Sequence, residues 1–242
     1  MTLFLNILFQ LIVSSSTLTD YDINYENNNK EIHALWNTIL QSHVDPNGNV
    51  NYQNLKSNSA DFEDYLQILS NTKPSQLNSE NAQIAFWINT YNAYTLKLIV
   101  DNYPVKSIKD IKKAWTTKFI TIGTKFYSLN EIEHDILRTY NKPEIHFAIN
   151  CASRSCPPLY NRAFSENQLD TQLKSVTSSF LNSRENLMIS DKKLVVSKLF
   201  KWYSKDFKAA GGVIAFINTY SDEIIPKNIK IEYLPYNWEL NE

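Results

Sequence analysis

In the first half of the chain, apolar residues recur every three or four positions, which is the spacing of an amphipathic α-helix. This pattern predicts helices over 31–43, 60–69 and 79–102, and Pro104 ends the third of them. The stretch AFWINTYNAYTLKLIV (85–100) is apolar on nearly all sides. A helix of that kind is buried, so this segment predicts the central helix of the fold.

In the second half, short strands and short helices are mixed. Residues 118–127 alternate about a glycine and predict a hairpin, and 187–196 predict a second hairpin that turns at Asp191-Lys192. Single short strands are predicted over 145–150 and 229–233. Helices are predicted over 128–140, 165–181, 200–207 and 213–220.

Two of these helices begin with the sequence pattern of a capping box. Ser128 with Glu131, and Ser165 with Gln168, are spaced so that each side chain bonds a free backbone N–H of the first turn. Long helices come first and strands are few, so the sequence predicts an α+β single domain. We expect a central buried helix, surrounding helices and a small, mostly antiparallel sheet.

The N-terminus differs in character from the rest of the chain. Leu3 to Val13 is apolar except at two positions, too short to span a bilayer but of the length of a signal-peptide core. No Lys or Arg precedes it, so an amphipathic N-terminal helix or a tail remains an alternative. Our interpretation is a signal peptide over 1–18, a polar linker over 19–30 and one domain over 31–242. This predicts a secreted or periplasmic protein.

Composition excludes several function classes. The chain has 242 residues with 24 Lys+Arg against 25 Asp+Glu, so electrostatic capture of nucleic acid has no support. Four glycines cannot form the glycine-rich loops that bind dinucleotides or triphosphates. Two cysteines cannot staple a disulfide-rich scaffold. We therefore expect no nucleic-acid partner and no stable membrane insertion.

The scarce reactive residues are concentrated in one window, from Glu131 to Cys156, which holds two of the four histidines and both cysteines. In the helix SLNEIEHDILRTY, Glu133 falls within the apolar stripe, His134 at its edge and Arg138 on the solvent side. A buried carboxylate needs a partner, so Glu133 is a candidate for orienting a histidine. A surface glutamate is the alternative.

The predicted strand IHFAIN leads into CASRSCPPLY. On that strand His146 and Asn150 share a face, and Cys151 follows its end, where side chains project into clefts. Free N–H groups of a following turn would lower the pKa of the Cys151 thiol. Cys156 precedes two prolines, which favour an extended backbone there.

Three interpretations of this window remain open. The first is a thiol nucleophile, Cys151, with His134 as base and Glu133 as acid. Adjacent helix positions point about 100° apart, so another group must hold His134, or Glu133 must hold His146. The second is a zinc site of two histidines and two cysteines, although their spacing matches no usual zinc pattern. The third is a structural or binding module in which Cys151 and Cys156 are bridged or inert.

Four segments resemble the family named domain of unknown function 547. They are AFWINTYNAYTLKLIV (85–100), SLNEIEHDILR (128–138), IHFAINCASRSCPPL (145–159) and the ending KLFKWYSKDF … YLPYNWELN (198–241). The resemblance matches Glu133 and His134 to the family's Glu-His pair, and Cys151 to its cysteine. The family is distantly similar to papain-like or transglutaminase-like thiol enzymes in permuted order. This implies a Cys-His-Glu hydrolase or amidase without cofactor. The family's substrate is not settled and does not carry over, so our own expectation is a peptide, isopeptide or γ-glutamyl amide as substrate, and no metal.

Further residues are candidates for supporting this site. Asn89 and Asn92 lie on one face of the apolar central helix, and buried amides must find partners. They either hold loops or orient His134 or an oxyanion. Arg154 is either a solvated loop residue or a binder of a substrate carboxylate. His146, Asn150 and Cys156 complete the set of supporting or substrate-binding candidates.

Overall fold

The computed structural model describes residues 32–190 and 192–242. The predicted signal peptide, the whole of the predicted linker and Asp191 of the predicted turn lie outside the described residues. The fold is a mixture of α-helices and short strands, as the sequence predicted. Within the described part of the chain, no helix is both long and apolar enough to cross a membrane.

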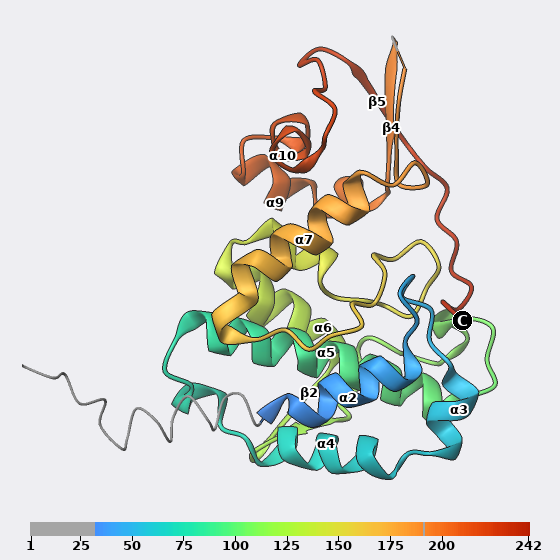
Figure 1. Ribbon diagram of the computed structural model, residues 1–242, viewed down its shortest axis with the longest axis vertical. Helices are drawn as coiled ribbons and strands as arrows, with labels where there is room; N and C mark the ends of the chain where they lie inside the picture. Colours follow the sequence, from blue (N-terminus) through green and yellow to red (C-terminus); the bar gives the residue numbers. More distant parts are fainter. Residues whose placement is uncertain (1–31, 191) are drawn as a thin grey trace, which may run out of the picture.

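The N-terminal helices pack around the long helix α5 (Figure 1). Their bounds are α2 Ala34–His43, α3 Tyr52–Ser57, α4 Ala60–Asn71 and α5 Glu80–Asn102. The prediction of a central buried helix is confirmed, since α5 is buried over most of its length. Sequence periodicity missed α3, whose six residues are too few to show a period.

The turn between α2 and α3 is built around Gly48. Val44 and Val50 form an isolated bridge at its base. Gly48 has φ +82°, and a Cβ there would lie 2.6 Å from the backbone nitrogen of Leu159. Only glycine fits this position, so the turn locks the N-terminal helices against the segment that follows the cysteines.

A hairpin and an irregular helical segment follow α5. Strands β1 (Ile120–Ile122) and β2 (Lys125–Tyr127) pair antiparallel, and the Ser128–Glu131 capping box forms as predicted. The helix then changes type along its length. It runs as α6 (Leu129–Glu131), a π-helical stretch η3 (Ile132–Ile136) and a 3₁₀ turn η4 (Leu137–Tyr140). A π-helical stretch is an insertion that often marks a functional site.

The predicted strand over 145–150 is wrong. These residues instead belong to a 3₁₀ helix, η5 (Pro143–Phe147), and to the turn after it. All six residues of 145–150 are buried, so no face is exposed and the alternation read as a strand has no structural meaning. A short apolar run does not distinguish a buried strand from a buried helical turn.

The C-terminal half adds helices and a second sheet. The remaining elements are the 3₁₀ turns η1 Pro74–Gln76, η2 Ile108–Asp110 and η6 Glu166–Gln168, the helices α7 Leu169–Leu181, α8 Leu199–Trp202, α9 Ser204–Ala209 and α10 Val213–Tyr220, and the strands β3 Leu187–Ile189, β4 Lys193–Val196 and β5 Lys230–Tyr233. The predicted hairpin is confirmed as antiparallel β3–β4, and β5 joins β4 in parallel. Ser165 precedes η6 without forming a side-chain cap, so the second predicted capping box is wrong.

After β5 the chain returns to the N-terminal helices and ends near α3 (Figure 1). Arg154 N donates to Glu239 O, and Val50 N donates to Asn241 O. The buried Asn241 side chain accepts from the Tyr52 hydroxyl at 2.7 Å. This tail therefore crosses the segment that carries both cysteines.

Candidate functional site

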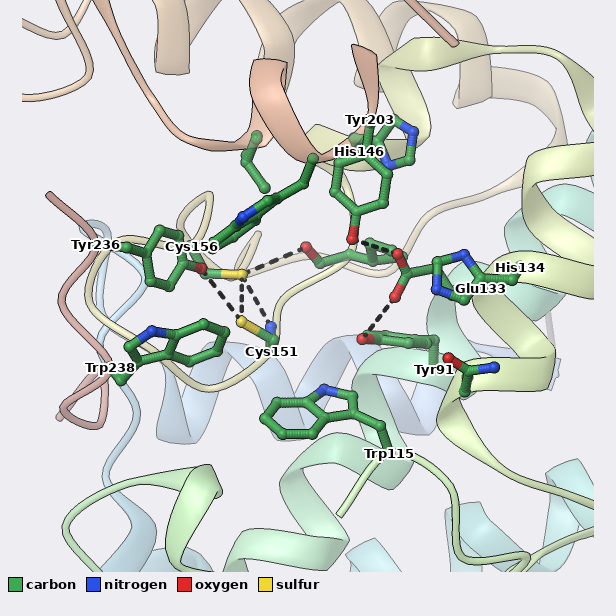
Figure 2. A pocket seen from close by; sticks show the side chains of 14 residues that line it. Tyr91, Trp115, Glu133, His134, His146, Cys151, Cys156, Tyr203, Tyr236 and Trp238 are labelled. Atoms are coloured by element: carbon green, nitrogen blue, oxygen red, sulfur yellow. Dashed lines mark hydrogen bonds between the residues drawn. The ribbon is translucent and has the colours of Figure 1, made fainter. Parts of the chain in front are cut away.

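A pocket of about 420 Å³ lies where six parts of the chain meet, one of them the loop that carries Trp115. Tyr91 of α5 and Glu133 of η3 line one side, and both cysteines of the turn after η5 line the other (Figure 2). Helix α8, the start of α9 and the C-terminal tail complete the wall. The window singled out in the sequence therefore does converge on one cavity.

The turn that carries Cys151 is held by buried amides. Asn92 of α5 accepts from Asn150 N at 2.9 Å and donates to Ala148 O at 2.9 Å. The Asn150 side chain accepts from Ala152 N at 2.7 Å and donates to Pro157 O at 2.8 Å. Ala152 adopts φ +58°, so the chain reverses directly after the cysteine. Asn92 and Asn150 are thus positioning residues for Cys151.

Three donors surround the Cys151 sulfur. The Cys156 thiol lies 2.9 Å away, the Ser153 hydroxyl 3.1 Å and the Tyr236 hydroxyl 3.4 Å. The hydrogen bond from Cys156 lowers the pKa of Cys151 below its ordinary value, and the two hydroxyls act in the same direction. Burial and the charge of Glu133 oppose this shift. The net result favours the thiolate, which is the nucleophilic form.

The pKa of Cys156 is shifted in the opposite direction. Burial raises its pKa well above the ordinary value, and the neighbouring Cys151 adds to this. Its sulfur also accepts from Cys151 N at 3.0 Å. Both cysteines are free, and 2.9 Å between the sulfurs is longer than the roughly 2.05 Å of a disulfide. The pair thus holds one acidic and one weakly acidic thiol side by side.

Glu133 is buried, as its place in the apolar stripe predicted. It accepts a hydrogen bond from the Tyr91 hydroxyl at 3.3 Å and another from the Tyr203 hydroxyl. Both carboxylate oxygens therefore act as acceptors for tyrosines, and neither bonds a histidine. The two residues that satisfy the buried carboxylate come from α5 and from the α8–α9 junction.

The ring of His134 accepts a hydrogen bond from Arg138. Nη1 of Arg138 lies 2.9 Å from His134 Nδ1, and Asp206 fixes the same guanidinium with two bonds of 2.7 Å. Arginine has only donors, so Nδ1 accepts and the proton of the neutral ring is on Nε2. His134 accordingly presents an N–H group at the pocket wall. Arg138, expected on the solvent side, is instead half-buried in this ion pair.

His146 belongs to the same network. Its Nε2 lies 2.8 Å from Asp206 Oδ2, and its ring stacks on Tyr203 with centroids 3.8 Å apart. Burial lowers the pKa of His146, although the bond to Asp206 acts against this. Among the described residues nothing bonds Nδ1 of His146. Asp206 thus joins both histidines to α9.

The structure brings most predicted site residues together but does not link them as a relay. No hydrogen bond among the described residues joins Cys151 to either histidine, and Figure 2 shows Cys151 and His134 on opposite sides of Glu133. Asn89 bonds the backbone of Phe164 and Arg154 pairs with Glu239 at the surface, so neither lines this pocket. The described residues contain no group of three or more His, Cys, Asp or Glu side chains arranged to hold a metal ion.

Sequence reasoning missed several residues that build the site. These are Tyr91, Trp115, Trp202, Tyr203, Tyr236 and Trp238 in the pocket wall and Asp206 behind the histidines. The segments KWYSKD (201–206) and YNW (236–238) carried a signal, since aromatic side chains gather there beside a carboxylate. The sequence alone does not show that they meet the cysteines.

Comparison with known proteins gives a family match. Residues 74–181 match the model of a family described as "Protein of unknown function, DUF547". No curated protein and no solved structure matches the chain. The matched range contains α5, the Glu133 helix and both cysteines, but not the tail that supplies Tyr236 and Trp238. The similarity to papain-like enzymes stays a prediction.

Proposed function

We propose a thiol-dependent hydrolase activity for this chain, which through residues 74–181 belongs to the DUF547 family of unknown function. In this proposal Cys151 is the nucleophile and the substrate is a carboxylic amide. The observation that carries the proposal is the lowered pKa of a cysteine that faces a pocket large enough for a small substrate. Thiols that are only structural are buried and inert.

The two cysteines supply an acid and a nucleophile. Groups whose pKa values are moved apart by their surroundings are candidates for opposite roles in catalysis. The pKa of Cys151 is lowered by the hydrogen bond from Cys156, while burial raises that of Cys156, which therefore keeps its proton at neutral pH. We assign the proton donor to Cys156.

The reaction then has two steps. The Cys151 thiolate forms a bond to the carbonyl carbon, the carbon–nitrogen bond breaks, and the Cys156 proton passes to the leaving amine. Water next attacks the thioester, gives one proton to the Cys156 thiolate and releases the acid with Cys151 as thiolate. The Nε2–H of His134 and the charge of Glu133 act on the substrate from the opposite wall. A direct base role for His134 would require Arg138 to release Nδ1.

Alkylation with iodoacetamide at pH 6 tests the proposal before any substrate is identified. A lowered pKa leaves enough thiolate for Cys151 to react at that pH, and peptide mapping should find the label on Cys151 and not on Cys156. Cys151→Ala should abolish labelling while its circular dichroism stays unchanged. A folded protein whose Cys151 resists alkylation at pH 6 contradicts the proposal.

A bridged, non-catalytic module is the second candidate, and the 2.9 Å approach of the two sulfurs favours it over the zinc site. Counting free thiols in protein purified without reductant separates the two. Two free thiols per chain support the hydrolase. A quantitative disulfide between Cys151 and Cys156 that persists at the redox potential of the native compartment supports the structural module.

A further inference from the structure

The walls of the Cys151 pocket are aromatic. Three of the five tryptophans of the chain line it, together with three tyrosines. The centroids of Trp202 and Tyr236 lie 4.7 Å apart, those of Tyr236 and Trp238 4.6 Å, and those of Trp238 and Trp115 5.9 Å. The rings therefore form a continuous surface beside the nucleophile. Figure 2 shows Trp238 beside Cys151 and Trp115 below it.

The charge of this pocket is negative. Glu133 is the one acidic residue among the described residues that line it, and no lysine or arginine lines it. Arg138, whose guanidinium lies 5.6 Å from the ring centroid of Tyr203 in the pocket wall, is paired with Asp206. A Cys151 thiolate adds a second negative charge. The described lining thus lacks a lysine or arginine side chain that would attract an anion.

Two aromatic rings of the wall already have a cation over them, Tyr203 with Arg138 and Trp238 with Lys109. Nζ of Lys109, which does not line the pocket, lies 5.2 Å from the ring centroid of Trp238. Aromatic faces attract ammonium groups through their quadrupole, and the attraction strengthens when the cation is desolvated. A carboxylate at the same site adds Coulomb attraction. Aromatic walls with one buried carboxylate are suited to a cation that has apolar surface.

We propose that this pocket is a subsite for an alkylammonium group. The inference deepens the proposed function and rests on it, because it assigns the substrate as an amide that carries an alkylammonium group within reach of Cys151. The aromatic rings contact the methylene or methyl groups around the nitrogen, and Glu133 supplies the opposite charge. Anionic amides are excluded by Glu133 and by the thiolate.

Equilibrium binding tests the subsite without catalysis. Choline serves as the cationic probe, and 3,3-dimethylbutan-1-ol, in which carbon replaces the charged nitrogen, is its neutral isostere. We expect choline to quench the fluorescence of the pocket tryptophans and to bind about tenfold more tightly than the isostere. Saturating choline should also slow alkylation of Cys151. Equal binding of the two probes, or no binding of either, overturns the subsite.

Matched variants locate the binding. Glu133→Gln and Trp238→Leu should each weaken choline binding about tenfold, while the exposed changes Glu223→Gln and Phe126→Leu leave it unchanged. Thermal unfolding confirms that each variant folds, and Trp202→Leu replaces any variant that does not. Choline affinity that is insensitive to both Glu133→Gln and a tryptophan variant overturns the proposal.

The two proposals fail in different ways. If Cys151 is alkylated at pH 6 but choline does not bind, the subsite is wrong and the hydrolase proposal stands. If choline binds with the stated selectivity but Cys151 is inert, the hydrolase proposal is wrong and the alkylammonium subsite stands. The assignment of an amide substrate is then wrong as well.

Discussion

At the residue scale, the properties of Cys151 depend on neighbours that donate hydrogen bonds and not on a histidine. Its lowered pKa is caused first by the Cys156 thiol and then by Ser153 and Tyr236. Each donor stabilises the thiolate more than the thiol, because a bond to a charged group is stronger than one to a neutral group. The activation of this cysteine is therefore distributed over several neutral groups.

Cys156→Ala should make Cys151 less reactive. Removing the first donor moves the pKa of Cys151 upward, so the midpoint of its alkylation profile shifts to higher pH and the rate at pH 6 falls about tenfold. The rate of Cys151 alkylation, measured in quenched reactions between pH 5 and 10, gives the profile. Cys156→Ser retains a donor, so the midpoint of its alkylation profile should lie between those of the wild-type protein and Cys156→Ala. An unchanged profile in Cys156→Ala contradicts this account.

Asn92→Ala tests the positioning of the nucleophile. The substitution removes the acceptor for Asn150 N and the donor for Ala148 O, both buried. Leaving them unpaired should destabilise the fold by about 2–3 kcal/mol and slow alkylation of Cys151. Urea unfolding and the alkylation rate measure the two effects. The exposed change Asn228→Ala is the control and should alter neither.

At the element scale, the irregular helix from Leu129 to Tyr140 and the short helix α9 form one unit. The π-helical stretch carries Glu133 and His134, and Asp206 of α9 fixes Arg138 and His146. Without α9, the basic groups of this unit would lose the carboxylate that neutralises them. The contact therefore keeps both histidines in place on the side of the pocket opposite Cys151.

Asp206→Asn should destabilise the fold in a pH-dependent way. The bond from Arg138 lowers the pKa of Asp206 below its unfolded-state value of about 3.9, so the ionised group stabilises the fold above that pH. The contribution is lost as pH falls through the folded-state pKa. We expect a cost of about 1–3 kcal/mol in urea unfolding at pH 7 and a smaller difference at pH 3. Asp170→Asn breaks an exposed pair and should cost below about 0.5 kcal/mol.

Helices were predictable from the sequence where an apolar stripe is long, as in α4 and α5, and where a capping box marks the start, as at Ser128. Burial of Glu133 also followed from its place in the stripe. The π-helical stretch was not predictable, because one extra residue per turn leaves no signature in the pattern. The partners of Glu133 and His134 were not predictable either, since Tyr203 and Asp206 are brought to them by tertiary packing alone.

At the scale of the whole molecule, the site is completed by the C-terminal tail. Tyr236 and Trp238 reach the pocket because the tail is anchored on both sides of the cysteine turn. Asn241 forms its buried end, where it bonds the Tyr52 hydroxyl and Gly48 O. The N-terminal helices therefore anchor the tail that carries Tyr236 and Trp238, although later parts of the chain form most of the pocket.

Asn241→Ala should weaken both stability and the site. The change leaves the Tyr52 hydroxyl and Gly48 O unpaired in the interior, at a cost of about 1–3 kcal/mol in thermal or urea unfolding. A loosened tail would also carry Tyr236 away from Cys151 and reduce alkylation at pH 6. Asn228→Ala, at an exposed position before the tail, is the control. Full stability and full reactivity in Asn241→Ala would show that the tail is not an anchor.

Part of the pocket wall comes from the end of the chain, so the pocket is completed late in folding. Tyr236 lies 85 positions beyond the cysteine whose sulfur it contacts. Closing a loop of that length costs entropy, and contacts between distant parts of a chain form slowly. A chain still emerging during synthesis thus carries Cys151 without its tyrosine donor and without the part of the aromatic wall that Trp202, Tyr236 and Trp238 form. We therefore expect the full shift of the Cys151 pKa only once the tail has folded against the cysteine turn.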